Sequence, residues 1–177
     1  MKPATFHPLA RLLHWLMALL ILGMLFIGVS MIGDLSPRHP LLVELHKATG
    51  LALLLLVVIR IGVRLSLPHP ALPADLPSLQ RLPAKASHWL LYALMLAMPL
   101  LGWAMLSAGG YPRPLQLPAI APHDLQLYAV LRQAHGWAGY LLFATVLIHL
   151  GAALMHALVR RDGVLRSMWP GPVGRGE

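Results

Sequence analysis

The chain has 177 residues, of which 58% are hydrophobic and only 11% charged, a composition typical of an integral membrane protein. Its 14 lysines and arginines outnumber its 6 acidic residues, but they are too few and too scattered to form a surface for nucleic acid, which we exclude as a partner. The absence of cysteine excludes disulfides, cysteine-ligated iron–sulfur clusters and attachment of a cofactor through thioethers.

Four apolar stretches are long enough to cross the hydrocarbon core of a membrane, which takes about 20 helical residues. In chain order they cover residues 9–32, 41–65, 84–107 and 131–160. Because a chain in lipid must satisfy its backbone hydrogen bonds internally, each stretch is predicted to be a helix. The sequence therefore predicts an all-α fold, a membrane four-helix bundle in which residues 1–177 form one domain. No Ala-x-Ala-like cleavage site follows the first stretch, so we expect that helix to be retained.

Turn-forming and proline-rich segments separate these stretches. The first ends at residues 34–37, Asp-Leu-Ser-Pro. A stiff, extended connector is expected after the second stretch, where prolines recur at Pro68, Pro70, Pro73, Pro77 and Pro83. The longest loop is predicted from Gly109 to about Tyr128. Pro99 lies inside the third stretch and is expected to bend that helix.

Basic residues predict the orientation of the bundle. One side collects ten of them, namely Lys2, Arg11, Arg60, Arg64, Arg81, Lys85, Arg160, Arg161, Arg166 and Arg175. The other side carries only Arg38, Lys47, Arg113 and Arg132. Cytoplasmic loops of membrane proteins are enriched in lysine and arginine, so both termini are predicted to be cytoplasmic.

Histidines occur at matching depths in three of the four predicted helices. His135 and His149 lie fourteen residues apart in the fourth helix, a rise of about 21 Å that returns the second side chain to within about 40° of the first. His14 falls near the cytoplasmic end of the first helix, and His46 near the outer end of the second. Depth therefore pairs His46 with His135 and His14 with His149.

Two pairs of imidazoles, one toward each membrane face, indicate two haem b groups with both axial positions of each iron filled, and hence electron transfer rather than oxygen binding. A zinc or copper site would gather its ligands more closely. The residues four positions after these histidines are Ala18, Gly50, Gly139 and Ala153, small side chains that leave room for a flat macrocycle. Two alternatives stay open: a histidine near a span end can be merely interfacial, and small residues also serve ordinary helix packing.

With these residues in place, the sequence resembles the bacterial cytochrome b561 family over about residues 5–170. The motifs that carry the resemblance are His14-Trp15, His46-x-x-x-Gly50, Arg60-x-x-x-Arg64 followed by Pro68, His135-x-x-x-Gly139, and His149 with His156. The resemblance implies haem b at the four paired histidines, exchange of electrons with ubiquinone and a place in the bacterial inner membrane among its lipids. Some members are superoxide oxidases, and others are haem subunits of hydrogenases or formate dehydrogenases.

We therefore expect a superoxide:ubiquinone oxidoreductase-type enzyme that needs no protein partner. The alternative is a haem b membrane-anchor subunit that transfers electrons for a partner dehydrogenase or hydrogenase. A third class, a transporter or structural protein without a cofactor, would lack the visible spectrum of haem.

Two basic residues adjoin the predicted outer haem. Lys47 follows His46, and Arg132 lies one helical turn before His135. They are expected to attract a small anionic reductant such as superoxide, or alternatively to bind haem propionates or lipid headgroups. Glu44 is expected to be an indirect partner of this site at most.

Further candidates lie at the cytoplasmic side. Arg11, Arg60 and Arg64 are candidate partners for haem propionates, since arginine binds carboxylates through two hydrogen bonds; the alternative is that they only set the topology. His156, about 10 Å beyond His149 along the helix, is a candidate donor of a proton or hydrogen bond to a quinone. His88 is a weaker candidate for that role, and the alternative for both residues is that they are simply interfacial.

Overall fold

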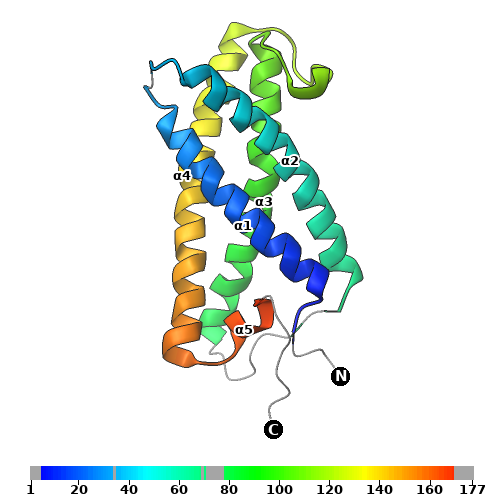
Figure 1. Ribbon diagram of the computed structural model, residues 1–177, viewed down its shortest axis with the longest axis vertical. Coiled ribbons are helices and arrows are strands. Elements are labelled where there is room, and N and C mark those ends of the chain that lie inside the picture. The colour runs from blue at the N-terminus through cyan, green and yellow to red at the C-terminus, as the bar shows by residue number, and fades with distance from the viewer. Residues whose placement is uncertain (1–4, 34, 69, 71–77, 170–177) are drawn as a thin grey trace.

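The computed structural model describes residues 5–33, 35–68, 70 and 78–169 (Figure 1). Its long helices are α1 (Pro8–Ser30), α2 (His39–Ser66), α3 (Ser78–Ala108) and α4 (Leu125–Leu154). A π-helical turn, Met155–Arg160, continues α4, and the short helix α5 (Val164–Met168) follows. A 3-10 turn, Pro114–Gln116, lies in the loop between α3 and α4, and no strand occurs among the described residues.

Four helical segments are long and apolar enough to span a membrane: Pro8–Ser30, His39–Ser66, Lys85–Ala108 and Leu125–Arg160. This confirms the predicted all-α, four-helix membrane fold. Of the residues named from the sequence, Lys2, Asp34, Pro73, Pro77 and Arg175 lie outside the described residues.

Two helix boundaries were predicted wrongly. The α3 helix begins at Ser78, so that Pro83 lies inside it rather than in an extended connector. The α4 helix begins at Leu125 rather than 131, because Asp124 caps it: Oδ1 of Asp124 accepts hydrogen bonds from the amides of Gln126 at 2.7 Å and Leu127 at 3.0 Å. Hydropathy alone did not reveal this cap.

The four long helices run up and down beside one another (Figure 1). The α1 helix packs along α2, α2 packs against α3, and α3 packs along α4. The amide of Phe6 donates a hydrogen bond to the carbonyl of Ser167 at 3.1 Å, so the start and finish of the described chain lie together. We call this the inner end of the bundle; the α1–α2 turn and the loop after α3 mark the outer end.

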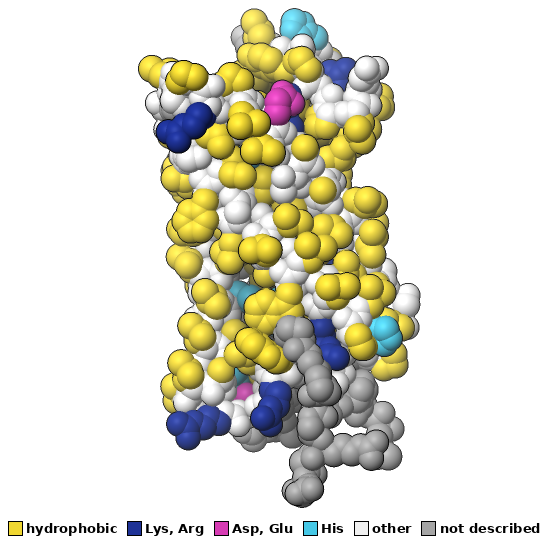
Figure 2. All heavy atoms as spheres, viewed as in Figure 1, with side chains coloured by type: hydrophobic (Ala, Val, Ile, Leu, Met, Phe, Trp, Pro, Cys, Tyr) yellow, Lys and Arg dark blue, Asp and Glu magenta, His cyan; other side chains and the backbone are white. Residues whose placement is uncertain are grey.

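Buried side chains are few, and the surface is largely apolar. Met17, Ile21, Val57, Leu94 and Leu142, from all four long helices, form the buried core cluster. Figure 2 shows hydrophobic side chains over the middle of the visible face, with charged side chains gathered toward its two ends. Such a distribution suits a bundle whose middle is surrounded by lipid.

The inner end is capped by α5, which was not predicted. Arg11 donates from Nη1 to the carbonyl of Trp169 at 2.8 Å, and Nε1 of Trp15 donates to the carbonyl of Met168 at 2.8 Å. The rings of Trp15 and Trp169 meet edge to face with centroids 5.6 Å apart. The end of the described chain is therefore fixed to the first turns of α1.

Candidate functional site

The four paired histidines form two sites of nearly equal geometry. The ring centroids of His14 and His149 are 6.2 Å apart and the ring planes are inclined by 72°. His46 and His135 are 6.0 Å apart at 71°. Metal–imidazole bonds are about 2 Å long, so two imidazoles on opposite sides of one metal have centroids about 6 Å apart. Both pairs have the separation that one metal between two rings requires.

At the outer pair, two glycines of neighbouring helices lie against the imidazoles. A Cβ at Gly28 of α1 would lie 3.7 Å from Cε1 of His46, and one at Gly102 of α3 would lie 3.5 Å from Cε1 of His135. The glycines singled out by sequence spacing have other neighbours: a Cβ at Gly50 would meet Met24 and one at Gly139 would meet Met98. The prediction that Gly50 and Gly139 leave room for a macrocycle is a different one and stays a prediction, while Gly28 and Gly102 are the glycines that contact the rings.

The outer imidazoles also carry buried nitrogens that lack normal hydrogen bonds. Nδ1 of His46 and Nδ1 of His135 are both buried without a partner. The backbone of Met98 interacts with the His135 ring, but outside normal hydrogen-bond geometry. An unsatisfied buried polar group costs about 1–3 kcal/mol, a cost that only a partner bonded to Nδ1 itself would remove, while Nε2 of each ring stays the possible ligand atom. These residues fit an axially ligated metal group.

The inner pair differs because an arginine contacts one ring. Arg60 donates from Nη1 to the carbonyl of Ala10 at 2.9 Å, and its Nη2 lies 3.2 Å from Nδ1 of His14. A guanidinium can only donate, so Nδ1 of His14 is the acceptor here. A metal-ligating histidine normally donates from its second nitrogen, so for a neutral ring this contact competes with ligation through Nε2.

A third imidazole lies at the inner end. The ring centroid of His88, on α3, is 5.4 Å from that of His149, and the His88 side chain is exposed.

Among the described residues, no three histidine, aspartate or glutamate side chains converge in a way that could hold a bare metal ion. A haem iron takes four ligands from the porphyrin and only two from the protein, so a pair suffices.

The structure changes the interpretation of Lys47. Its ammonium lies 2.6 Å from Oε1 of Glu44 and donates to the carbonyl of Pro112 at 3.2 Å. The side chain of Lys47 is only 11% exposed, so its charge is both balanced and shielded. Arg132, in contrast, is exposed. Glu44 is a partner of Lys47, a contact that the i, i+3 spacing would have revealed.

The three candidate arginines all lie at the inner end. Arg60 and Arg64 line one small cavity together with Phe6, Ala10, Tyr92 and Met168. The guanidinium of Arg64 stacks 5.0 Å above the centre of the Phe6 ring. Arg11 is held toward the carbonyl of Trp169, as described above.

His156 lies in the π-helical turn after α4 and is paired with a carboxylate. Nδ1 of His156 is 2.5 Å from Oδ2 of Asp162, and Nε of Arg160 donates to the same oxygen at 3.1 Å. Burial acts to raise the pKa of Asp162, but hydrogen bonds from His156, the Val164 amide and Arg160 outweigh it and hold that pKa below its usual value. Asp162 is therefore ionised at neutral pH. Sequence reasoning did not identify this residue.

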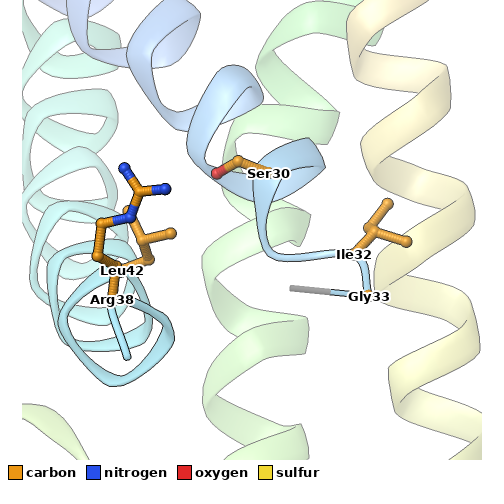
Figure 3. Close-up of a pocket in the computed structure, with 5 residues that line it drawn as sticks. All are labelled: Ser30, Ile32, Gly33, Arg38 and Leu42. Carbon is orange, nitrogen blue, oxygen red and sulfur yellow. The ribbon is translucent and has the colours of Figure 1, made fainter. Parts of the chain in front are cut away.

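A separate cavity of about 440 Å³ lies at the outer end, lined by Ser30, Ile32, Gly33, Arg38 and Leu42. Figure 3 shows Arg38, the residue before α2, together with Leu42 on one side, and Ser30, Ile32 and Gly33 from the end of α1 and the turn after it on the other. None of the residues predicted to form a functional site lines this cavity.

Residues 5–171 match the family described as prokaryotic cytochrome b561. The chain belongs to this family. Cytochrome b561 proteins are membrane electron-transfer proteins that bind haem b, so this chain is a multi-pass bacterial membrane oxidoreductase. The family resemblance recognised in the sequence is confirmed.

Three relatives are similar over most of their length. The "Probable superoxide oxidase CybB" of Yersinia pestis is 30% identical over 165 residues, which cover 89% of this chain and 92% of the relative. "Cytochrome b561 homolog 2" of Escherichia coli (strain K12) is 28% identical over 173 residues, covering 94% and 92%. "Cytochrome b561 homolog 1" of the same strain is 29% identical over 168 residues, covering 89% and 93%.

Proposed function

We propose that this cytochrome b561 protein oxidises superoxide at its outer end and reduces ubiquinone at its inner end, in the bacterial inner membrane. In the balanced reaction, two superoxide ions lose one electron each to become dioxygen, and one quinone takes up two electrons and two protons to become quinol. The observation that carries the proposal is the two histidine pairs, each with ring centroids about 6 Å apart. The name of the Yersinia pestis relative supports superoxide as the donor.

In this proposal, His14 and His149 hold one haem b and His46 and His135 hold the other. When bound, a haem with two imidazole ligands supplies reversible one-electron transfer without an open iron position. Arg60 would give up its contact with His14 and bind a propionate carboxylate of the haem instead. The His14 imidazole could then ligate the haem iron. Arg11 and Arg64 are the other proposed partners of haem propionates, because all three arginines lie at the inner end.

The orientation proposed for the bundle follows from charge. The end where Phe6 meets Ser167 carries most of the basic residues, and cytoplasmic segments are enriched in lysine and arginine. The inner end would therefore face the cytoplasm, so that both termini are cytoplasmic. The outer histidine pair would then face the periplasm, where an anionic donor arrives.

Purified protein, produced with an adequate supply of haem, tests the proposal. The expected spectrum is that of reducible b-type haem, with about two haems per chain, and superoxide should drive reduction of added ubiquinone. A haem-loaded protein that is inert alone but active with a bound dehydrogenase or hydrogenase would support the anchor-subunit alternative. Protein without a haem spectrum would overturn both.

We expect anion attraction at the outer end to depend on Arg132 more than on Lys47, because Glu44 neutralises Lys47. Arg132→Gln should slow reduction of the protein by superoxide by about 2- to 5-fold at low ionic strength and flatten its salt dependence. Lys47→Gln should change the rate less. Rapid-mixing kinetics at several salt concentrations measure both variants.

Arg38→Gln is the matched control, because it removes another outer-end charge that lines the separate cavity. Equal slowing by Arg38→Gln and Arg132→Gln would mean that net charge alone matters. A larger effect of Lys47→Gln than of Arg132→Gln would contradict the proposal that Arg132 is the main residue that attracts the anion.

A further inference from the structure

The carboxylate of Asp162 joins three groups at the inner end of the bundle. Its Oδ2 accepts from Nδ1 of His156 at 2.5 Å and from Nε of Arg160 at 3.1 Å, and its Oδ1 accepts from the amide of Val164 at 3.2 Å. The side chains of His156 and Asp162 are only 14% and 11% exposed. The contact is therefore a shielded His–Asp pair rather than a solvated surface ion pair.

The backbone is distorted in a way that makes this pair possible. Residues six apart on a regular α-helix point in widely different directions. Here the last turn, Met155–Arg160, is π-helical, and Arg161 and Gly163 then have φ angles of +53° and +78°. A positive φ is unfavourable for a residue with a side chain such as Arg161. Widened turns of this kind are frequent at functional sites.

The pair also fixes where the proton of the imidazole lies. A carboxylate is an acceptor only, so the hydrogen in this contact belongs to Nδ1 of His156. Arg160 on the same oxygen favours the ionised carboxylate. In the neutral ring, Nε2 is then the nitrogen without a hydrogen, and it is the atom that can gain and release a proton.

We propose that Asp162 is a positioning residue, which holds His156 in the tautomer that passes protons to the quinone. This proposal rests on the proposed function. For each O–H bond formed on the quinone, Nε2 of protonated His156 gives up one proton and is recharged from cytoplasmic water. The electrons come from the outer donor. Asp162 keeps its charge throughout and stabilises the protonated ring, as the aspartate does in a Ser–His–Asp triad.

A purely structural role must be separated from this one, because Oδ1 of Asp162 also accepts a hydrogen bond from the amide of Val164, the first residue of α5. Asp162→Asn is the informative variant, since the side-chain oxygen of asparagine can accept the same hydrogen bond from the Val164 amide. It removes the charge and allows the wrong tautomer of His156. Asp124→Asn is the matched control, because Oδ1 of Asp124 also accepts hydrogen bonds from backbone amides at the start of a helix, those of Gln126 and Leu127 in α4.

The experiment compares two electron acceptors with stoichiometrically reduced, haem-loaded protein. Decylubiquinone needs protons as well as electrons, whereas ferricyanide takes up electrons alone. Asp162→Asn should slow oxidation by decylubiquinone by about 100-fold, near the lower end of general acid–base effects, and leave oxidation by ferricyanide unchanged. Asp162→Glu should recover part of the rate, and Asp124→Asn should match the wild type.

The second readout is whether the effects of the His156 and Asp162 substitutions on the rate of quinone reduction add. The double variant His156→Gln/Asp162→Asn should be no slower than His156→Gln alone, because both changes disable one proton path. Equal slowing with both acceptors, or a double variant slower than either single one, would overturn the positioning role. If the wild type reduces ferricyanide but not decylubiquinone, the proposed acceptor is wrong, and the role of Asp162 fails with it.

Discussion

Replacing His149 with alanine is expected to lower the haem content of the purified protein from about two per chain to about one. The reason is that the ring centroids of His149 and His14 are 6.2 Å apart, the separation that one metal between two imidazoles requires. His14→Ala should lose the same haem. The double variant that lacks both His14 and His149 should also lose only that one haem. The haem-to-protein ratio of each purified variant is the measurement. Superoxide-driven quinone reduction should fall to the level without protein.

Two controls make the pairing testable. A variant lacking His14 and His135 breaks both pairs and should lose both haems. His88→Ala should keep both, although the ring of His88 is only 5.4 Å from that of His149. Loss of one haem in His88→Ala, with both retained in His14→Ala, would make His88 the true partner of His149.

Gly109→Ala is expected to destabilise the outer end of the bundle by about 1–3 kcal/mol. A Cβ at Gly109 would lie 2.5 Å from two carbons of the Tyr111 ring and 2.9 Å from Cδ2 of Tyr128. These aromatic rings also pack on each other, with centroids 5.5 Å apart, so neither moves independently. The midpoint of thermal unfolding in detergent should fall by about 2–4 °C per kcal/mol.

Gly136→Ala is the control for this substitution. Gly136 lies within α4, and a Cβ there has no neighbour within 4 Å. Alanine in a helix is favoured over glycine by roughly 0.5–1 kcal/mol, so this variant should unfold at the same temperature or a higher one. An unchanged midpoint for Gly109→Ala would show that the tyrosine rings give way at no cost.

The helices were predictable because their signal is local. Length and hydropathy alone identify segments that can cross lipid, and all four were found. The pairing of the histidines also followed from the sequence, since the rise and rotation along α4 place His135 and His149 at two depths on related faces. The structure brings together the same pairs, while haem ligation itself stays a prediction.

Contacts between distant elements were not predictable in the same way. Gly28 and Gly102 approach the outer imidazoles from helices that carry neither ring, so no spacing within one helix indicates them. The contact of Arg60 with His14 joins α2 to α1. The pair of His156 with Asp162 depends on a π-helical turn and a left-handed residue. Hydrophobic periodicity carries no information about such local departures from α-helical geometry.

The α4 helix contributes one imidazole to each pair, so the number of residues between His135 and His149 sets both the distance and the relative rotation of the two sites. Removing a single residue between His135 and His149 would rotate one imidazole by about 100° relative to the other and shorten their axial separation by about 1.5 Å. Loops elsewhere can absorb added or lost residues, but this interval cannot do so without detaching a ring from its partner. Insertions and deletions there should therefore be the least tolerated in the chain.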